Sequence, residues 1–212
     1  MKEQQPLKWR YAVKKFDPAR PLSGGQIELL KQSFNLTATS FGLQPISMLV
    51  VHHPEIQEQL VPHTYGQRQV ADASHVLVIC VETKVDNAFI NAYFDRVGQL
   101  RGTSESILER YRRDLIGRFR GMSGDEIRSW AINQAYLALG NLLTVCAYER
   151  IDSCPMEGFV PDGYNAVLGL AEQGLEAVLV MPVGHRAQDD AFSEFEKVRR
   201  PMESSVRTIE KK

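Results

Sequence analysis

The 212 residues of this chain are 43% hydrophobic and 24% charged, which predicts one ordinary globular domain over residues 1–212. The formal net charge is −1 and no apolar run nears the roughly 18–20 residues that span a bilayer, so we expect no nucleic acid and no membrane as partner. Three widely spaced cysteines and a polar N-terminus without a signal-peptide core predict a reduced, cytoplasmic protein.

Short helices and two apolar strands are predicted for the first half of the chain. Ser23 and Gln26 have the spacing of a capping box, in which the two side chains satisfy unpaired N–H groups at a helix start. A loop rich in hydroxyl groups follows that helix and can surround a ligand with polar donors. The predicted elements are a helix within 2–12, a helix from Ser23 to Phe34, the loop over 37–45, strands over 46–53 and 75–82, and one or two short helices between those strands.

The second half contains a charged helical region, a long helix and a third apolar strand. Residues 86–120 read as helical and carry many arginines, which suits a solvent-facing excursion. The remaining predicted elements are a helix over 161–173 closed by Gly174, a strand from Ala177 to Val183 that ends at Gly184, and an edge strand over 204–209. Because strands and helices alternate without regular βαβ spacing, we expect an α+β fold with a central sheet flanked by helices.

The longest predicted helix begins at Ser123, where Glu126 completes a second capping box. Its apolar residues recur at intervals of three and four and become nearly continuous after Leu137, which indicates a helix buried on most sides. Small residues along it would let another backbone approach closely, namely Ala131, Ala135, Ala138 and Gly140. After this helix the chain continues to a tight turn at 155–158. A buried helix can hold such a turn in a fixed place, which suits a functional site.

The chain lacks the sequence motifs of common cofactor and catalytic sites. It has no GxGxxG, Walker, GxSxG or HExxH motif, and its histidines show no metal-ligand spacing. We expect His75 to be a hydrogen-bonded structural residue and Cys154 to be a buried thiol rather than a reactive one. Two basic clusters stand at opposite ends of the chain, and most such clusters lie on solvated faces. They are Arg10 with Lys14, and Lys197 with Arg199.

Six short motifs, in order and over nearly the whole chain, resemble those of the nitroreductase family of flavoproteins. Each motif alone is weak, but six in the family's order are specific. They are Arg-Tyr-Ala-Val-Lys-Lys-Phe-Asp at 10–17, Thr-Ser-Phe-Gly-Leu-Gln-Pro at 39–45, Asp-Ala-Ser-His at 72–75, Pro-Met-Glu-Gly at 155–158, Pro-Val-Gly-His at 182–185 and Lys-Val-Arg-Arg-Pro at 197–201. Within the family the chain resembles oxygen-insensitive NAD(P)H nitroreductases and related flavin and quinone reductases.

The resemblance implies a nitroreductase-like α+β fold with a mainly antiparallel sheet, and a homodimer with FMN sites at the subunit interface. The helix from Ser123 would lie in that interface, residues 86–120 near the substrate entrance, and the tail 190–212 on the partner subunit. The implied activity is ping-pong transfer of hydride from NADH or NADPH, through flavin N5, to a nitroaromatic, quinone or related small electrophile. A specialised flavoenzyme of this scaffold, such as a dehalogenase or dehydrogenase, and a non-catalytic flavin-binding dimer remain alternatives.

The resemblance also assigns roles to individual positions. Arg10, Lys197 and Arg199 match the positions that bind the FMN phosphate. Lys14 matches a cation at the flavin N1–C2 edge that stabilises the reduced ring, which makes it the catalytic candidate. The other matched positions are Tyr11 and Ala12 beside the ring, Gln67 and Gln69 at its pyrimidine edge, Pro155, Met156, Glu157 and Gly158 in the turn whose N–H groups face N5, and Thr39, Ser40, Gly42 and Gln44 in a loop that reaches the partner subunit's flavin.

Two departures from the family pattern affect the site. The asparagine of the 39–45 motif is Gly42 here, so a side-chain contact is lost or replaced by backbone. The tryptophan that commonly follows Gln-Pro is Ile46, which changes a pocket wall. No ribose-phosphate motif is present, so the sequence decides neither between NADH and NADPH nor the physiological acceptor.

Overall fold

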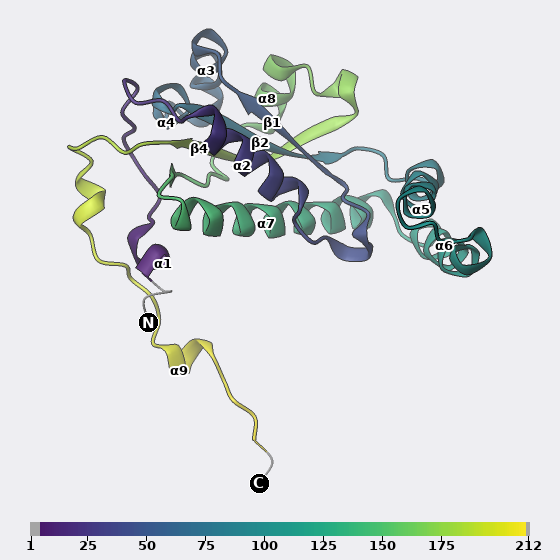
Figure 1. Ribbon diagram of the computed structural model, residues 1–212. Coiled ribbons are helices and arrows are strands. Elements are labelled where there is room, and N and C mark those ends of the chain that lie inside the picture. The colour runs from purple at the N-terminus through teal and green to yellow at the C-terminus, as the bar shows by residue number, and fades with distance from the viewer. Residues whose placement is uncertain (1–4, 211–212) are drawn as a thin grey trace.

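An antiparallel sheet with strand order β1-β2-β4-β3 crosses the centre of the molecule (Figure 1). The computed structural model describes residues 5–210. Within them the strands are β1 (Ile46–Val51), β2 (His75–Glu82), β3 (Asp152–Ser153) and β4 (Leu175–Gly184). The predicted α+β fold with a mainly antiparallel sheet is confirmed.

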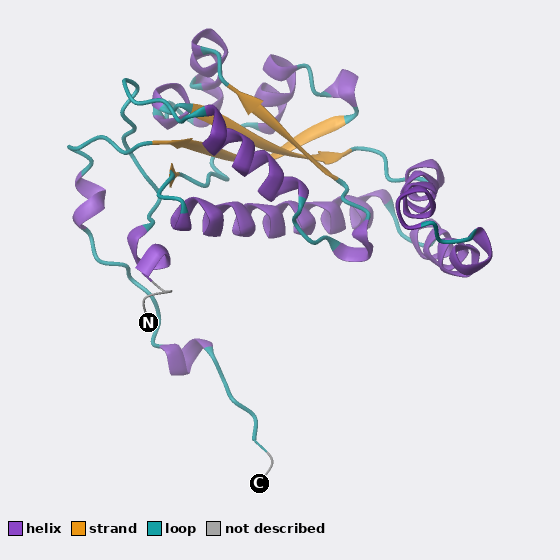
Figure 2. Ribbon diagram, in the orientation of Figure 1, coloured by secondary structure: helices purple, strands orange, loops and turns teal. Residues whose placement is uncertain are grey.

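The sheet is buried on both faces because helices cover each of them (Figure 2). Alternate residues of β2 enter opposite cores, with Val76, Val78 and Cys80 on one side and Leu77, Ile79 and Val81 on the other. This two-sided burial explains why the strand is apolar at nearly every position rather than at every second one. The helices α3, α4 and α8 contribute to the first core, and α2 and α7 to the second.

The described part of the chain contains nine helices. Both predicted capping boxes form: the Oγ atoms of Ser23 and Ser123 each accept from the N3 backbone N–H, and the backbone N–H of each serine donates to the N3 side chain. The helices are α1 (Gln5–Trp9), α2 (Gly24–Asn35), α3 (Pro54–Leu60), α4 (Gln69–Asp72), α5 (Asn87–Arg101), α6 (Glu105–Arg120), α7 (Gly124–Tyr148), α8 (Pro161–Leu168) and α9 (Met202–Ser205).

Two sequence predictions differ from the structure. The helix expected over 161–173 ends at Leu168, because Gly169 adopts a left-handed conformation that stops it five residues before Gly174. The edge strand expected over 204–209 is absent, and this segment instead holds the end of α9 and an extended stretch. The helix expected within 2–12 is α1, and residues 1–4 lie outside the described residues.

The long helix α7 is buried along one side only within this chain. Its sheet-facing residues are buried from Ala131 to Ala147. The opposite side exposes Tyr136, Leu137, Gly140 and Tyr148, and Leu137 retains 53% of its accessible surface. A helix with apolar residues on an uncovered side is typical of an interface with another chain.

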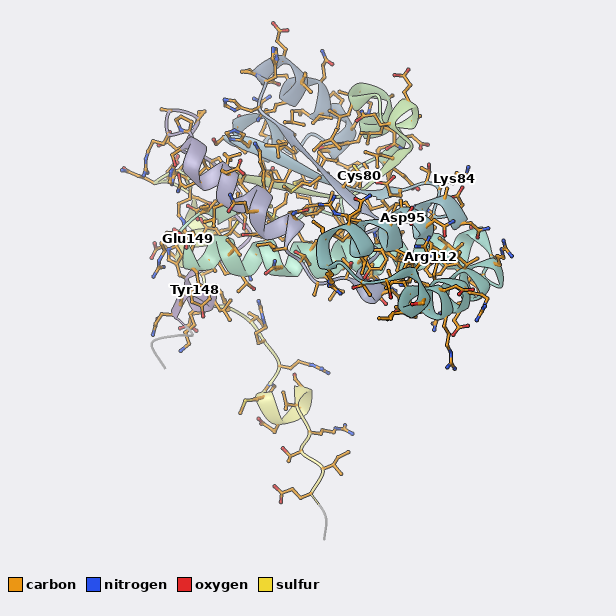
Figure 3. All side chains as sticks on the ribbon, turned by 45° about the vertical axis from the view of Figure 1, so that its right-hand side comes forward. Cys80, Lys84, Asp95, Arg112, Tyr148 and Glu149 are labelled. Atoms are coloured by element: carbon orange, nitrogen blue, oxygen red, sulfur yellow. The ribbon has the colours of Figure 1, made fainter. Side chains whose placement is uncertain are left out.

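Helices α5 and α6 form a hairpin that extends beyond one end of the sheet (Figure 1). Their own small core contains Leu43, Ile90, Phe94, Leu115 and Phe119. At the junction Arg112 bonds Asp95 at 3.0 Å and Glu105 at 2.8 Å, and Figure 3 shows Arg112 and Asp95 close together. At the other end of α7 the C-terminal segment that carries α9 leaves the body of the molecule (Figure 1).

Replacing Ser123 with alanine is expected to lower the free energy of unfolding by about 1 kcal/mol, since it removes the cap at the start of α7. Urea unfolding followed by circular dichroism measures this loss. Ser104 is a matched control, because it occupies the N-cap position of α6 without a capping hydrogen bond. An equal loss in Ser104→Ala would show that the Ser123 cap adds nothing specific.

Candidate functional site

Basic residues from both ends of the chain line one surface pocket of about 350 Å³. Arg10, Tyr11, Ala12 and Lys14 form one wall, and the segment from Phe192 to Arg199 forms the other. The two basic clusters predicted from the sequence therefore meet in space.

The electrostatics of this pocket favour an anion. Burial, followed by the charge of Arg199, lowers the pKa of Arg10. Burial, followed by the charges of Arg10, Arg199 and Arg186, lowers the pKa of Lys197. Among residues 5–210 no carboxylate pairs with Arg10, Lys197 or Arg199, and the buried Arg10 Nε has no hydrogen-bond partner. An oxyanion in the pocket would relieve the repulsion and satisfy that donor.

The buried carboxylate of Asp190 joins the two walls. Its Oδ2 accepts hydrogen bonds from the Tyr11 hydroxyl (2.8 Å), the Lys14 N–H (2.9 Å) and the Lys15 N–H (3.2 Å). Its Oδ1 accepts from the Phe192 N–H at 3.1 Å. Burial raises the pKa of Asp190, but these hydrogen bonds outweigh it and the net shift is downward. The segment that carries Lys14 is thereby held against the C-terminal wall.

Cation–π contacts hold the Tyr11 ring in the pocket wall. The Arg186 guanidinium lies 4.4 Å from the Trp9 ring centroid and 4.5 Å from that of Tyr11. Arg186 also donates from its backbone N–H and its Nε to Asp152, at 2.8 and 2.7 Å. Asp152 is buried, so this pair fixes Arg186 and, through it, the ring of Tyr11.

The N-terminal wall of the pocket pairs with the residues that lead into the turn at 155–158. Ala12 pairs with Ser153 in a parallel bridge, and the Val13 N–H donates to the Ser153 oxygen at 3.2 Å. The charge of Lys14 acts on the Cys154 thiol, whose pKa burial raises. Lys14 therefore stands between the basic pocket and the turn that follows Cys154.

The second half of the turn, Glu157 and Gly158, is exposed and is held by two side chains. Tyr136 of α7 donates to Glu157 Oε1 at 2.7 Å, and Gln67 Nε2 donates to the Gly158 oxygen at 3.2 Å. Of the two amides expected near the site, the structure places Gln67 against the turn and buries Gln69 at the start of α4. Met156 is buried through its pairing with Val180 of β4.

The loop with Thr39, Ser40, Gly42 and Gln44 does not join this group within one chain. The Ser40 N–H donates to Gln134 in the first half of α7, whereas α1 lies beside the far end of α7, where Arg150 stacks on Trp9. Figure 3 shows Tyr148 and Glu149 at that far end. From Gln134 to its end at Tyr148, α7 spans about 21 Å at 1.5 Å per residue, so the loop and the basic pocket are well separated.

Comparison with known proteins decides the family. The sequence model described as "Nitroreductase family" matches residues 7–185. The chain belongs to the nitroreductase family. Its relatives include an oxygen-insensitive NAD(P)H nitroreductase of Salmonella typhimurium, 27% identical over 94% of this chain and 96% of the relative, and the Bacillus subtilis protein YfkO, 34% identical over 85% of this chain and 87% of the relative.

Solved structures confirm the nitroreductase fold. A nitroreductase-like protein of Streptococcus mutans superposes with a TM-score of 0.81, 23% identity and coverage of 97% of both chains. A protein of Exiguobacterium sibiricum, crystallised in complex with FMN, superposes with a TM-score of 0.84 and 18% identity, covering 97% of this chain and 96% of that one.

Three features of this nitroreductase-family site were missed from the sequence. Asp190 stands in a charged segment and carries no motif, so nothing distinguishes it from a solvated acid. The Asp152–Arg186 pair joins residues far apart in the sequence, and Tyr136 looks like one more aromatic residue on an apolar helix. Each is recognised only from its contacts.

The cysteines and His75 of this nitroreductase-family chain have structural surroundings. Burial raises the pKa of the Cys80 and Cys146 thiols to about 12. His75 is hydrogen-bonded to Ser74 at 2.9 Å as expected, stacks on His52, and has its pKa lowered to about 4, chiefly by burial. Residues 5–210 hold no cluster of three metal ligands and no helix both long and apolar enough to cross a bilayer.

Proposed function

We propose that this chain is an FMN-dependent NAD(P)H oxidoreductase that reduces nitroaromatics, quinones or related electrophilic acceptors in a ping-pong cycle. Family membership and relatives named NAD(P)H nitroreductases support this proposal. The observation that carries it is the convergence of Arg10, Lys197 and Arg199 on one pocket, with an unpartnered buried Nε.

The residues present fit FMN. Its dianionic phosphate suits the three cations, and each charge-assisted bond contributes roughly 1.5–3 kcal/mol, so losing one weakens binding by about one to two decades. The isoalloxazine ring would lie along Tyr11, Ala12 and Lys14 toward the turn at 155–158. Gln67 is the better placed of the two amides for its pyrimidine edge, because its side chain is at the turn.

The protein's own part in the reaction is binding, orientation and charge. Bound FMN supplies hydride transfer at its N5 atom. The Lys14 ammonium would stabilise negative charge on the ring edge, and the N–H groups of Glu157 and Gly158 would face the ring from the turn. The Glu157 carboxylate holds the turn through Tyr136 and has no proton-transfer role in this proposal.

A homodimer would complete each site. In a two-fold dimer packed through the exposed side of α7, with the axis perpendicular to that helix, the two copies of α7 would run in opposite directions. This arrangement would bring the Thr39–Gln44 loop of one subunit to the basic pocket of the other. The tail would cover the partner subunit, because Val198, Met202 and Ile209 are exposed in the single chain. Residues 86–120 would then border substrate access.

Leu137→Asp is expected to weaken the dimer by at least tenfold, because it places a charge in the apolar contact. Size-exclusion chromatography with light scattering over a concentration series measures the effect. Leu36→Asp is the matched control, since Leu36 is also exposed but lies outside α7. A monomeric wild-type protein, or equal effects of both variants, would exclude this interface.

Stopped-flow spectroscopy of the FMN-loaded protein tests the function. Rapid bleaching of the flavin band by NADH or NADPH, then rapid reoxidation by menadione or nitrofurazone, is the expected result. A specialised flavoenzyme would bleach but reoxidise slowly with these acceptors. The CLA-ER enone reductase has the same fold, with a TM-score of 0.80 and 16% identity. A flavin-binding dimer without catalysis would not bleach with either nucleotide.

A further inference from the structure

A small basic pocket lies beside the Thr39–Gln44 loop, on the second half of α5. It measures about 140 Å³ and is lined by Gly42 and Gln44 from the loop and by Tyr93, Arg96, Leu100 and Arg101 from α5. This volume is below the roughly 300 Å³ of a pocket that encloses a whole small molecule, so it suits one group of a larger ligand.

Close packing between the loop and α5 builds this pocket. Gly42 has φ +74°, and a Cβ atom there would lie 2.7 Å from the Tyr93 hydroxyl. The tyrosine therefore occupies the space that a side chain at position 42 would need. An edge-on contact with Phe94 at 5.2 Å supports the Tyr93 ring. Within residues 5–210 the Tyr93 hydroxyl has no hydrogen-bond partner, so it is available to a ligand.

The charge of this pocket is not neutralised by the chain. Arg110, Arg112 and Arg113 on the neighbouring α6 each pair with a carboxylate. Arg96 and Arg101 form no ion pair in the described part of the chain. The helix dipole stabilises a cation in the last turn of α5, which explains Arg101 without any ligand. Arg96 lies more than a turn earlier, so the dipole does not explain its charge.

We propose that Tyr93, Arg96 and Arg101 form a subsite for a small oxyanion carried by a reactant. The oxyanion is either the 2′-phosphate of NADPH or the acidic group of an electron acceptor, because two guanidinium groups and a phenol donor suit both. This inference rests on the proposed function, which brings the Thr39–Gln44 loop to the partner subunit's cofactor site. The subsite would make the protein prefer NADPH over NADH, or acidic acceptors over neutral ones, and the sequence motifs reveal neither preference.

Steady-state kinetics of Arg96→Ala, Arg101→Ala and the double variant distinguish the two sources. If the oxyanion is the 2′-phosphate of NADPH, KM for NADPH is expected to rise about fivefold per substitution, with KM for NADH unchanged. If the oxyanion is the acidic group of the acceptor, KM rises for anthraquinone-2-sulfonate and not for neutral menadione. Calorimetric titration of the FMN-loaded protein with adenosine 2′,5′-bisphosphate, compared with AMP, reports the phosphate contact without turnover.

Arg110→Ala is the matched control, because it removes the same charge from the neighbouring helix at a residue 88% exposed. Equal rises in KM for Arg110→Ala and the pocket variants would overturn the subsite in favour of long-range attraction. Wild-type KM values for NADPH and for the sulfonate in the double variant would also overturn it. Failure of either nucleotide to bleach the wild-type flavin is a different result, which removes the proposed function itself and the subsite with it.

Discussion

Asp190→Asn is expected to lower the free energy of unfolding by about 3 kcal/mol and to weaken FMN binding by roughly tenfold or more. The amide would place an NH₂ group against donors that now face a carboxylate, namely the N–H groups of Lys14 and Lys15 and the Tyr11 hydroxyl. The wall that carries Lys14 would then separate from the C-terminal wall. Urea unfolding of the apoprotein and fluorescence titration with FMN measure the two effects.

The stability difference should also depend on pH. The pKa of Asp190 is lowered in the folded protein, so its contribution is present above the unfolded value of about 3.9 and is lost as pH falls through the folded pKa. Wild type and Asp190→Asn are therefore expected to converge in stability in acid below pH ~4. Asp189→Asn is the control, because that exposed neighbour only pairs with Lys15. A wild-type advantage that persists undiminished in strong acid would contradict this account.

Lys14→Ala is expected to reduce turnover by roughly ten- to a hundredfold while FMN still saturates the site. Lys14 is exposed, lies between the basic pocket and the 155–158 turn, and makes no ion pair in the described residues, so its charge is available to the cofactor. Loss of that charge should also lower the flavin midpoint potential by about 30 mV for each 1.4 kcal/mol of lost stabilisation. Rapid-reaction kinetics and a spectroelectrochemical titration measure both.

Lys15→Ala controls for the loss of a neighbouring charge, because Lys15 is directed to Asp189 instead of the pocket. Lys14→Arg should restore part of the turnover and most of the potential. If Lys14→Ala lost only FMN affinity and regained full turnover at saturating flavin, Lys14 would be a binding residue alone.

The sheet and the main helices could be predicted from the sequence because their signals are local. The apolar run of β2 reports burial on two faces, and each capping box places a helix start to the residue. The end of α8 was placed too late, since Gly169 and Gly174 both adopt left-handed conformations and only packing decides which of them stops the helix. The two residues of β3 are too few to produce a pattern.

The site could be predicted in part. Motif resemblance assigned the basic residues, and the structure brings Arg10, Lys197 and Arg199 to one pocket. It did not predict Asp190, because hydrogen bonds to backbone N–H groups leave no trace in the sequence. The Tyr93 contact at Gly42 was equally hidden, since no pattern relates a glycine to a tyrosine on another element.

Assembly of the basic pocket from both ends of the chain has a consequence for biosynthesis. All four strands precede Lys197 and Arg199 in the chain, so the pocket still lacks its second wall while the strands are being made. A nascent chain therefore has no complete basic pocket until Arg199 has left the ribosome, and an anion can contact both walls only after that point. A single protease cut after Lys197 would remove Val198 and Arg199 from that wall and leave the sheet intact.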